Sequence, residues 1–438
     1  MTLSSRDVFA PSRRQVLLGG LAVGASLVLP GCSVTGTSSK KGSAGSGSGT
    51  VQALFMQQAG YSVTDVKAMV AKFEKANSGI KVVPTFVTYE ALHDKIVTAA
   101  AAATYDIVLI DVIWPAEFGS KSIVADVTSK YPASWQTDML GGALTTALYK
   151  KKQYGVPWGV DTKFFYSNTE LMQKAGVTAT QLDTWDGVLA AAKTIQSKTN
   201  VKYPLVWSWK QAEALMCDYT QLVGAFGGKF LDDSGKLIIN QGGAVKALEW
   251  MRQTITDGLT NPASTTFLEA DVEKTLNNAQ AAFGLNWTYY YGVSNDAKTS
   301  KVVGKIDINQ TPAGPGGKRP GVNGSMALSV AKGSKNQAAA WKLIEYLTSE
   351  EVLDAYAKDA LPIWKSSYTL DDVVNTAPET FAAAGKQLSD LIVRPQVVNY
   401  NGVSQLIQVE LQNALLGKKS AQQALDDAVT AATPKLGG

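Results

Sequence analysis

Aromatic and polar side chains that follow expected strands are the residues of this sequence best suited to binding chemistry. The 438-residue chain has 10 Trp and 16 Tyr. These rigid rings with polar edges can stack on a small molecule, although most aromatic residues in any protein pack in its core. In open α/β sheets, ligands bind beyond the carboxyl ends of the strands. The apolar runs 51–56 and 105–111 read as strands, and the side chains that follow them are expected to form half of a site: Gln57, Tyr61, Asp111 and Trp114. Alternatively, Asp111 only caps the next turn and Trp114 packs over it.

Residues for nucleophilic or metal-based catalysis are scarce. The single histidine is His93, which falls in a helical pattern and is expected at the surface. Cys217 is the only cysteine after Cys32, and a lone cysteine is most often a small buried apolar residue. Neither an HExxH nor a GxSxG motif is present, and no GxGxxG opens a helix after a strand. We therefore expect no metal, no cofactor and no histidine-based triad.

Composition describes a globular protein of ordinary character. Apolar residues make up 45% and charged residues 18%, and the formal net charge is +4. That balance gives no reason to expect nucleic acid as a partner. The length exceeds one typical core and favours two lobes.

The spacing of apolar residues indicates the elements that would position the site. A helix with buried positions at Val66, Met69, Val70 and Phe73 follows the first strand, and a second strand starts at Ile80. A second helix is expected over 89–103, before the strand at 105–111. The order strand, helix, strand, helix, strand predicts a doubly wound α/β sheet.

The N-terminus has the parts of an export signal. Arg13 and Arg14 precede the apolar run 16–29, which is too short for a confident spanning helix. The arginine pair resembles a bacterial twin-arginine signal. Leu29-Pro30-Gly31-Cys32 resembles a lipobox, with Pro30 where a small residue is usual, and this implies lipidation at Cys32. The alternative is an ordinary signal peptide with a chance cysteine. We predict a signal over 1–32 and a flexible Ser- and Gly-rich linker over 33–50.

An ordered set of motifs carries a family resemblance that covers nearly all of the chain after Val51. The motifs are GVPWGVD at 155–161 with FFYSNTELMQKAG at 164–176, TWD at 184–186, AQAAFGLNW at 279–287, and AAAW with IEYLTS between 338 and 349. Together they resemble the bacterial extracellular solute-binding proteins of the carbohydrate-binding type that includes maltose-binding proteins.

The resemblance implies a type II periplasmic-binding-protein-like α/β fold. Each lobe would be a mainly parallel sheet flanked by helices, with a ligand cleft between the lobes. The first lobe would comprise 51–161 plus 322–360, and the second 162–321 plus 361–438. The implied function is a monomeric receptor that captures a sugar or oligosaccharide by hinge closure. It would deliver the solute to the permease subunits of an ABC importer from the outer face of the cytoplasmic membrane, held there only by its lipid.

Further site residues follow from this resemblance and from sugar chemistry. Rings stack on the C–H faces of a sugar, while polar and charged groups bond to its hydroxyls. Trp207 and Trp209 alternate along one expected strand, so at most one should face the cleft. Asp161 could instead stabilise the crossing segment. The added candidates are the rings Trp207, Trp209, Trp287, Tyr289 and Tyr400 and the polar groups Asp161, Asn323 and Arg394.

Other functions remain open from sequence. A peptide, a polyamine or a metal complex could replace the sugar as ligand, and polyamine sites favour several acids around an aromatic box. A secreted glycoside hydrolase would also use stacking rings, but it needs two carboxyl groups at a defined separation that sequence cannot place. A surface scaffold or adhesin would show no ligand-induced change of shape.

Overall fold

The structure is a computed structural model, and it describes residues 48–437. The predicted signal over 1–32, its lipidation site Cys32 and most of the predicted linker over 33–50 lie outside the described residues. Within residues 48–437, no helix combines the length and apolar character needed to cross a membrane.

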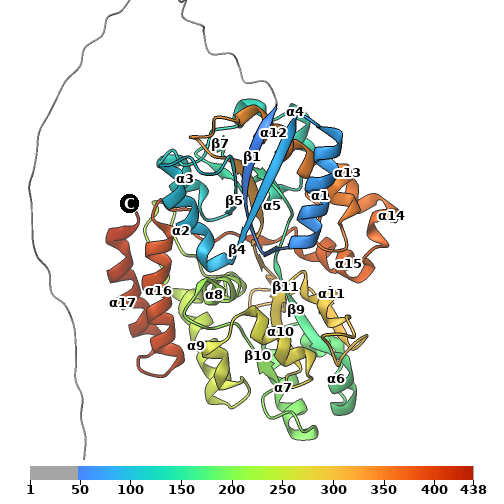
Figure 1. The fold of residues 1–438 in the computed structure, drawn as a ribbon. Coiled ribbons are helices and arrows are strands. Elements are labelled where there is room, and N and C mark those ends of the chain that lie inside the picture. The colour runs from blue at the N-terminus through green and yellow to red at the C-terminus, as the bar shows by residue number, and fades with distance from the viewer. Residues whose placement is uncertain (1–47, 438) are drawn as a thin grey trace, which may run out of the picture. The chain divides into compact units, whose positions relative to one another are not determined.

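A five-stranded sheet forms the centre of the first lobe (Figure 1). Its strand order is β4-β1-β5-β14-β8, and the apolar side chains of β1 and β5 are buried, as the sequence predicts, except for the half-buried Met56 at the end of β1. β1 begins at Gly49, inside the segment that we predicted as linker, because Gly49 and Thr50 pair with the start of β4. The strands are β1 (Gly49–Met56), β4 (Ile80–Val87), β5 (Ile107–Asp111), β8 (Val156–Pro157) and β14 (Met326–Val330).

Helices cover this sheet, and their starts follow local capping chemistry. α1 begins after Ser62, whose side chain accepts from the Asp65 amide while the Asp65 side chain accepts from the Ser62 amide. The predicted apolar stripe from Val66 to Phe73 is its buried face. The helices are α1 (Val63–Ala76), α2 (Tyr89–Ala100), α3 (Pro115–Ser120), α4 (Ala133–Asp138), α5 (Gly141–Leu144), α12 (Gln337–Leu347) and α13 (Glu350–Ala355). Short hairpins pair β2 (Gln58–Ala59) with β3 (Tyr61–Ser62) and β6 (Leu148–Tyr149) with β7 (Lys152–Gln153).

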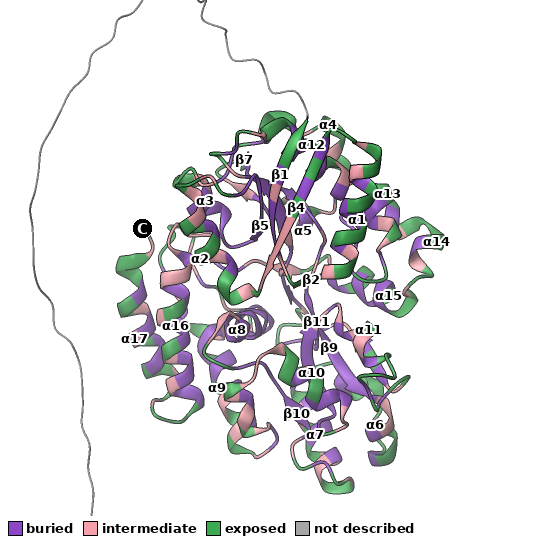
Figure 2. Cartoon of the chain, viewed as in Figure 1, coloured by how far each residue is buried: buried purple, intermediate pink, exposed green. Residues whose placement is uncertain are grey.

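A four-stranded sheet of order β10-β11-β9-β12 forms the second lobe. The central helix α8 is buried along nearly its whole length (Figure 2). The strands are β9 (Lys163–Asn168), β10 (Leu205–Val206), β11 (Phe283–Trp287) and β12 (Ile306–Asn309). The helices are α6 (Thr169–Ala175), α7 (Trp185–Lys198), α8 (Glu213–Ala225), α9 (Gly242–Thr256), α10 (Glu269–Asn277) and α11 (Tyr290–Ser294), with α16 (Tyr400–Leu415) and α17 (Ala421–Ala432) packed beside α8 and α9. Single 3₁₀ turns lie at Thr128–Lys130, Ala179–Leu182, Pro262–Thr266, Ser366–Thr369 and Thr433–Lys435.

Both sheets are mainly parallel in strand direction, as expected, but each contains one strand that runs the opposite way. β14 runs antiparallel to β5 and β8, and β9 runs antiparallel to β11 and β12. The cause is the path of the chain. β9 and β14 each start where the chain has just crossed between lobes, so they run away from the crossing, whereas β1, β5 and β11 run toward it.

The crossing segments pair with one another. Val160 bridges Leu361, Thr162 bridges Asn323, and β13 (Gly321–Val322) pairs with β15 (Leu391–Ile392). Downstream, Trp364 packs edge-on against Trp135 of the first lobe with ring centroids 5.8 Å apart. α14 (Asp371–Val374) and α15 (Pro378–Gln387) follow, with α15 beside β12. We therefore propose that residues 361–370, which we had assigned to the second lobe, belong to the first; the other lobe boundaries stay predictions.

Candidate solute-binding site

A cavity of about 740 Å³ is lined by residues of both lobes. Its volume lies within the range of about 300–1,000 Å³ that is typical of small-molecule sites. The carboxyl ends of β1, β5 and β11 all open into it, as the strand-end rule requires. Its aromatic lining is Tyr89, Trp114, Trp158, Trp287 and Tyr289, and its polar lining includes Gln57, Asp111, Asp161, Glu213, Glu269 and Arg394.

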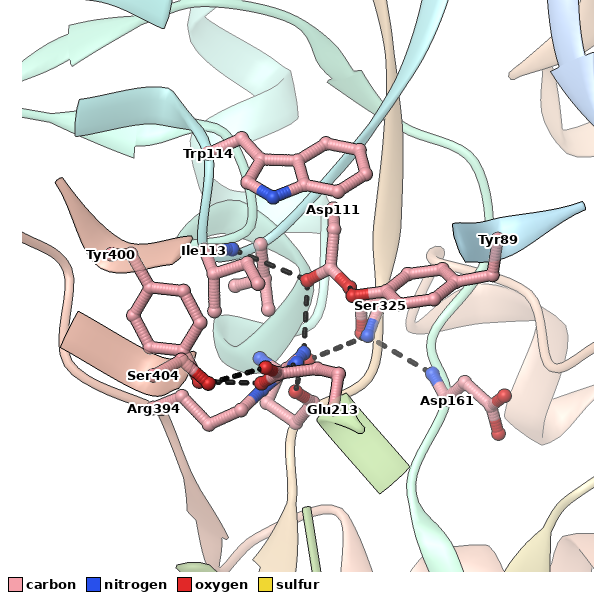
Figure 3. Close-up of polar contacts among 12 residues, drawn as sticks. Tyr89, Asp111, Ile113, Trp114, Asp161, Glu213, Ser325, Arg394, Tyr400 and Ser404 are labelled. Carbon is pink, nitrogen blue, oxygen red and sulfur yellow. Dashed lines mark hydrogen bonds and ion pairs between the residues drawn. The ribbon is translucent and has the colours of Figure 1, made fainter. Parts of the chain in front are cut away.

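Arg394 joins carboxylates of the two lobes (Figure 3). Its guanidinium donates to Asp111 Oδ1 at 2.9 Å and to Glu213 Oε1 at 2.8 Å. Asp111 ends β5 of the first lobe, and Glu213 begins α8 of the second. Burial disfavours the charge on Arg394, but the carboxylate of Asp111 and then that of Glu213 hold its pKa well above the ordinary value. The predicted site residues Asp111 and Arg394 are thus bound to each other.

Trp114 lies at the edge of this cluster and packs against Tyr89. The two rings are stacked with centroids 5.9 Å apart, and the Tyr89 hydroxyl donates to Asp111 Oδ2 at 2.8 Å. Trp114 Nε1 donates to Asn401 Oδ1 at 3.2 Å, which is a further bond between the first lobe and the start of α16. Asp111 and Trp114 both lie at the cavity, where the strand-end rule expects them, and their contact with a solute stays a prediction. Both also make contacts of the alternative kind, since Asp111 Oδ1 accepts from the Ile113 amide of the next turn.

Trp287 is held from several sides. The buried Lys163 ammonium lies 5.2 Å from the centre of its ring, and the indole Nε1 donates to Glu269 Oε1 at 3.2 Å. Gly324 lies so close that a Cβ there would come within 2.2 Å of Trp287 Cζ3. Lys163 is in turn bound to Asp218 at 2.7 Å and to Glu269 at 3.1 Å. Burial opposes the charge on Lys163, but the two carboxylates raise its pKa above the ordinary value.

Asp161 stands beside Trp287 where the chain crosses between lobes. Its Oδ1 accepts from the Thr288 hydroxyl at 2.6 Å, from the Thr288 amide at 3.2 Å and from the Thr162 amide at 2.9 Å. Burial raises the pKa of Asp161 to about 6 in spite of these bonds. Figure 3 shows its carboxylate turned away from the Arg394 guanidinium. Asp161 thus does stabilise the crossing, and it also lines the cavity.

Four predicted aromatic contacts lie in packed surroundings and not in the cavity lining. Tyr61 is a core residue of the first lobe, packed on Trp158 with ring centroids 4.8 Å apart. Trp207 and Trp209 are both buried in the core of the second lobe, stacked on each other at 5.5 Å. Neither ring lines the cavity, which is compatible with the expectation that at most one faces the cleft. The expectation that the two rings alternate between faces is wrong, because both follow the short strand β10 and pack against each other. Tyr400 is also buried, and its hydroxyl donates to Glu213.

Of the remaining predicted residues, Asn323 is buried away from the cavity, whereas Gln57 and Tyr289 line it. Asn323 is fully buried, and its side chain bonds to the Gly142 carbonyl and the Ser325 amide, so it builds the hinge. Gln57 is exposed and lines the cavity, and Tyr289 is half-buried in its wall.

Sequence reasoning missed several lining residues, above all the acids Glu213 and Glu269 and the histidine. Both glutamates begin helices, α8 and α10, and nothing in their local sequence separates them from other acids in first turns. His93 is not the surface residue that we expected: it packs between Trp114 and Phe118, and its Nε2 lies 2.8 Å from Glu117 Oε2. An aromatic signal was present for Trp158, since it lies inside the GVPWGVD motif.

Comparison with known proteins agrees with this geometry. The family model for "Bacterial extracellular solute-binding protein" matches residues 60–354. A protein of Deinococcus radiodurans named "Probable ABC transporter-binding protein" is 32% identical over 344 residues, which cover 74% of this chain and 79% of that protein. The arabinooligosaccharide-binding protein of Bacillus subtilis is 27% identical over 332 residues, 74% of each chain. The structure of maltose-bound T. maritima MalE3 superposes with a TM-score of 0.79 at 28% identity, covering 87% of this chain and 98% of that one. The chain therefore belongs to the bacterial extracellular solute-binding protein family, and it is a two-lobed binding protein, not an enzyme.

Proposed function

We propose that the protein captures a sugar or oligosaccharide in the cavity between its lobes and delivers it to the permease subunits of an ABC importer. The observation that carries this proposal is the fixed Trp287 ring, with the Asp161 carboxylate beside it, in the wall of a cavity of suitable size. A flat ring and a neighbouring acceptor match the C–H face and the hydroxyl rim of a sugar.

Two relatives that are more than a quarter identical to this chain support the same class of solute through the ligands in their names. One is named for arabinooligosaccharide and the other is bound to maltose. The protein is not a glycoside hydrolase, because its family is one of binding proteins.

Hinge closure is the mechanism that we propose. The lobes are connected by paired crossing segments, and a solute that contacts both lobes favours the closed arrangement. The buried Asp111–Arg394–Glu213 cluster would act as the pivot, since its two ion pairs join a carboxylate of each lobe to the same guanidinium. Asp161 and Trp287 would then contact the solute while this cluster keeps the lobes in register.

We further propose that the receptor is a monomeric lipoprotein on the outer face of the cytoplasmic membrane. The twin-arginine-like signal and the lipobox-like Leu29-Pro30-Gly31-Cys32 support it. Expression of the full chain with labelled palmitate should give a labelled membrane-bound protein, and Cys32→Ser should lose both the label and the membrane fraction. A Cys32→Ser protein that keeps its label would refute lipidation at this residue.

Calorimetry of the purified full chain in mild detergent tests the binding function. Maltose and arabinooligosaccharides are the first probes, followed by other neutral sugars and polyols. We expect saturable binding of at least one, and a loss of about ten-fold or more in affinity for Trp287→Ala, because hot-spot aromatic residues contribute about 2 kcal/mol or more. If no sugar or polyol binds the folded protein, the proposed function is wrong.

A further inference from the structure

The charges that line the cavity are strongly unbalanced. Its lining carries a single guanidinium, Arg394, and a single imidazole, His93. Carboxyl groups are far more numerous, and they come from the first lobe, the crossing segment and the second lobe. They are Glu90, Asp111, Asp161, Glu213, Glu269 and Asp359.

The two cations in the described lining, Arg394 and His93, and Lys163 next to it are bound to carboxylates of the protein. Arg394 is bound to Asp111 and Glu213, and Lys163, under the Trp287 ring, is shared by Asp218 and Glu269.

His93 contacts Glu117 on one ring nitrogen and Asp94 on the other. An anionic solute would therefore find no cation in the described lining without a carboxylate partner.

Three of the lining carboxyl groups, by contrast, form no ion pair with a cation of residues 48–437, although Lys163 lies near Asp161 and Lys358 near Asp359. Glu90 and Asp359 are exposed, and no ion pair joins either of them to a described residue. Asp161 is only partly exposed, and its three hydrogen bonds all end on Oδ1. Within the described chain, no hydrogen bond ends on Asp161 Oδ2. Because Asp161 lines the cavity, this oxygen is an acceptor that a solute can still use.

We propose that the solute carries a protonated amine, as in an amino sugar or an amino-substituted cyclitol, and that Asp161 Oδ2 accepts from its ammonium group. This inference rests on the proposed function and narrows its substrate class. A charged donor on a carboxylate forms a stronger hydrogen bond than a hydroxyl does. The ring of Trp287 next to Asp161 adds a surface that attracts cations. The exposed carboxylates of Glu90 and Asp359 raise the local concentration of a cationic solute.

The burial of Asp161 also favours a solute that carries an ammonium group. Burial raises the pKa of Asp161 to about 6 even though the nearby Lys163 ammonium and the bonds from Thr288 and Thr162 favour its charged form. An ammonium group on the solute would add a second positive charge beside this carboxyl group. A uronate or a sugar phosphate would instead bring a second negative charge toward an unpaired carboxylate, so anionic sugars are excluded.

Calorimetry of the full chain with matched series of probes tests the inference. Each series has a neutral hexose, its 2-amino-2-deoxy form, its N-acetylated form and its uronate, built on the glucose, galactose and mannose scaffolds at pH about 7.5. We expect an amine to bind about ten-fold tighter than its neutral parent, from the difference between charged and neutral hydrogen bonds. N-acetylation should abolish the gain, and the uronates should not bind. The ratio of amine to neutral affinity should also fall as salt is added.

Asp161→Asn supplies the matched variant, because its amide oxygen can keep the bonds to Thr288 and Thr162 while the charge is removed. The ratio of amine to neutral affinity should fall to near one. Glu249→Gln on the exposed face of α9 changes the net charge equally and should keep the ratio.

Amines that bind no tighter than their parents, or amines that do not bind at all, overturn the inference. If neutral sugars bind while the amines show no gain, the proposed sugar receptor stands and only the preference for an amine is wrong. A uronate that binds as well as the neutral sugar overturns it too. If Asp161→Asn does not fold, the amine, N-acetyl and salt comparisons on the unchanged protein still decide.

Discussion

Replacing Gly324 by alanine should weaken solute binding by displacing the ring of Trp287, without replacing Trp287 itself. The new Cβ would lie 2.2 Å from Trp287 Cζ3 and 2.6 Å from Cη2. Because carbon atoms pack at about 3.5–4.0 Å, the ring must move by more than about 1 Å. The bond from Trp287 Nε1 to Glu269 Oε1 is already 3.2 Å long, so a displacement of that size breaks it.

The expected loss of affinity follows from the lost position of the ring. Binding groups need to be held to within about 0.5 Å of their productive place. We therefore expect Gly324→Ala to weaken sugar binding about 10- to 100-fold, or about 1.4–2.8 kcal/mol. Overpacking should lower the free energy of unfolding by about 1–3 kcal/mol, which a folded two-lobed protein can tolerate.

Calorimetry with the best-binding sugar measures the affinity, and circular dichroism measures the fold and the melting temperature. Gly316→Ala is the matched control, because a Cβ there has no neighbour within 4 Å. It should bind as the unchanged protein does. A folded Gly324→Ala protein with unchanged affinity would refute the view that Trp287 is a fixed platform for the solute.

Three further predictions concern stability and the core. Lys163→Met should lower the free energy of unfolding by about 3–5 kcal/mol in urea titrations, because it leaves Asp218 buried without its partner. Trp207→Phe should lower stability by about 1–3 kcal/mol through the lost bond to Thr260 and the smaller ring, yet leave sugar affinity unchanged in calorimetry. The pKa of His93 is raised, since its bonds to Glu117 and Asp94 outweigh burial, so its stabilising effect should be complete below pH about 6.5 and lost as pH rises through the folded value. Melting temperatures of the unchanged protein and of His93→Gln, compared across pH, measure that effect.

Each of these has a control or a contrary outcome. Lys246→Met on the exposed side of α9 should change stability by less than about 0.5 kcal/mol. If Trp207→Phe weakened sugar binding, Trp207 would belong to the binding site after all. A difference between the unchanged protein and His93→Gln that grows with rising pH would show that the direction assigned to the His93 pKa is wrong.

Local patterns in the sequence were enough to predict much of the fold and the first half of the site. The strand–helix order of the first lobe is set by apolar periodicity, which is a local property. The strand-end rule then placed Asp111 and Trp114 at the cavity, since the carboxyl end of a strand can be read from where its apolar run stops. The order of motifs along the chain was enough for the family resemblance.

Tertiary structure alone decided which charges meet and which rings stay free. Arg394 and Glu213 are 181 residues apart, and Arg394 and Asp111 are 283 apart, so no local pattern links them. Trp207 is no less aromatic than Trp287, but it lies on a face that other elements cover. The directions of β9 and β14 depend on where the chain crosses between lobes. Packing between distant segments fixes these features, whereas periodicity and motif reading report only on neighbours in the chain.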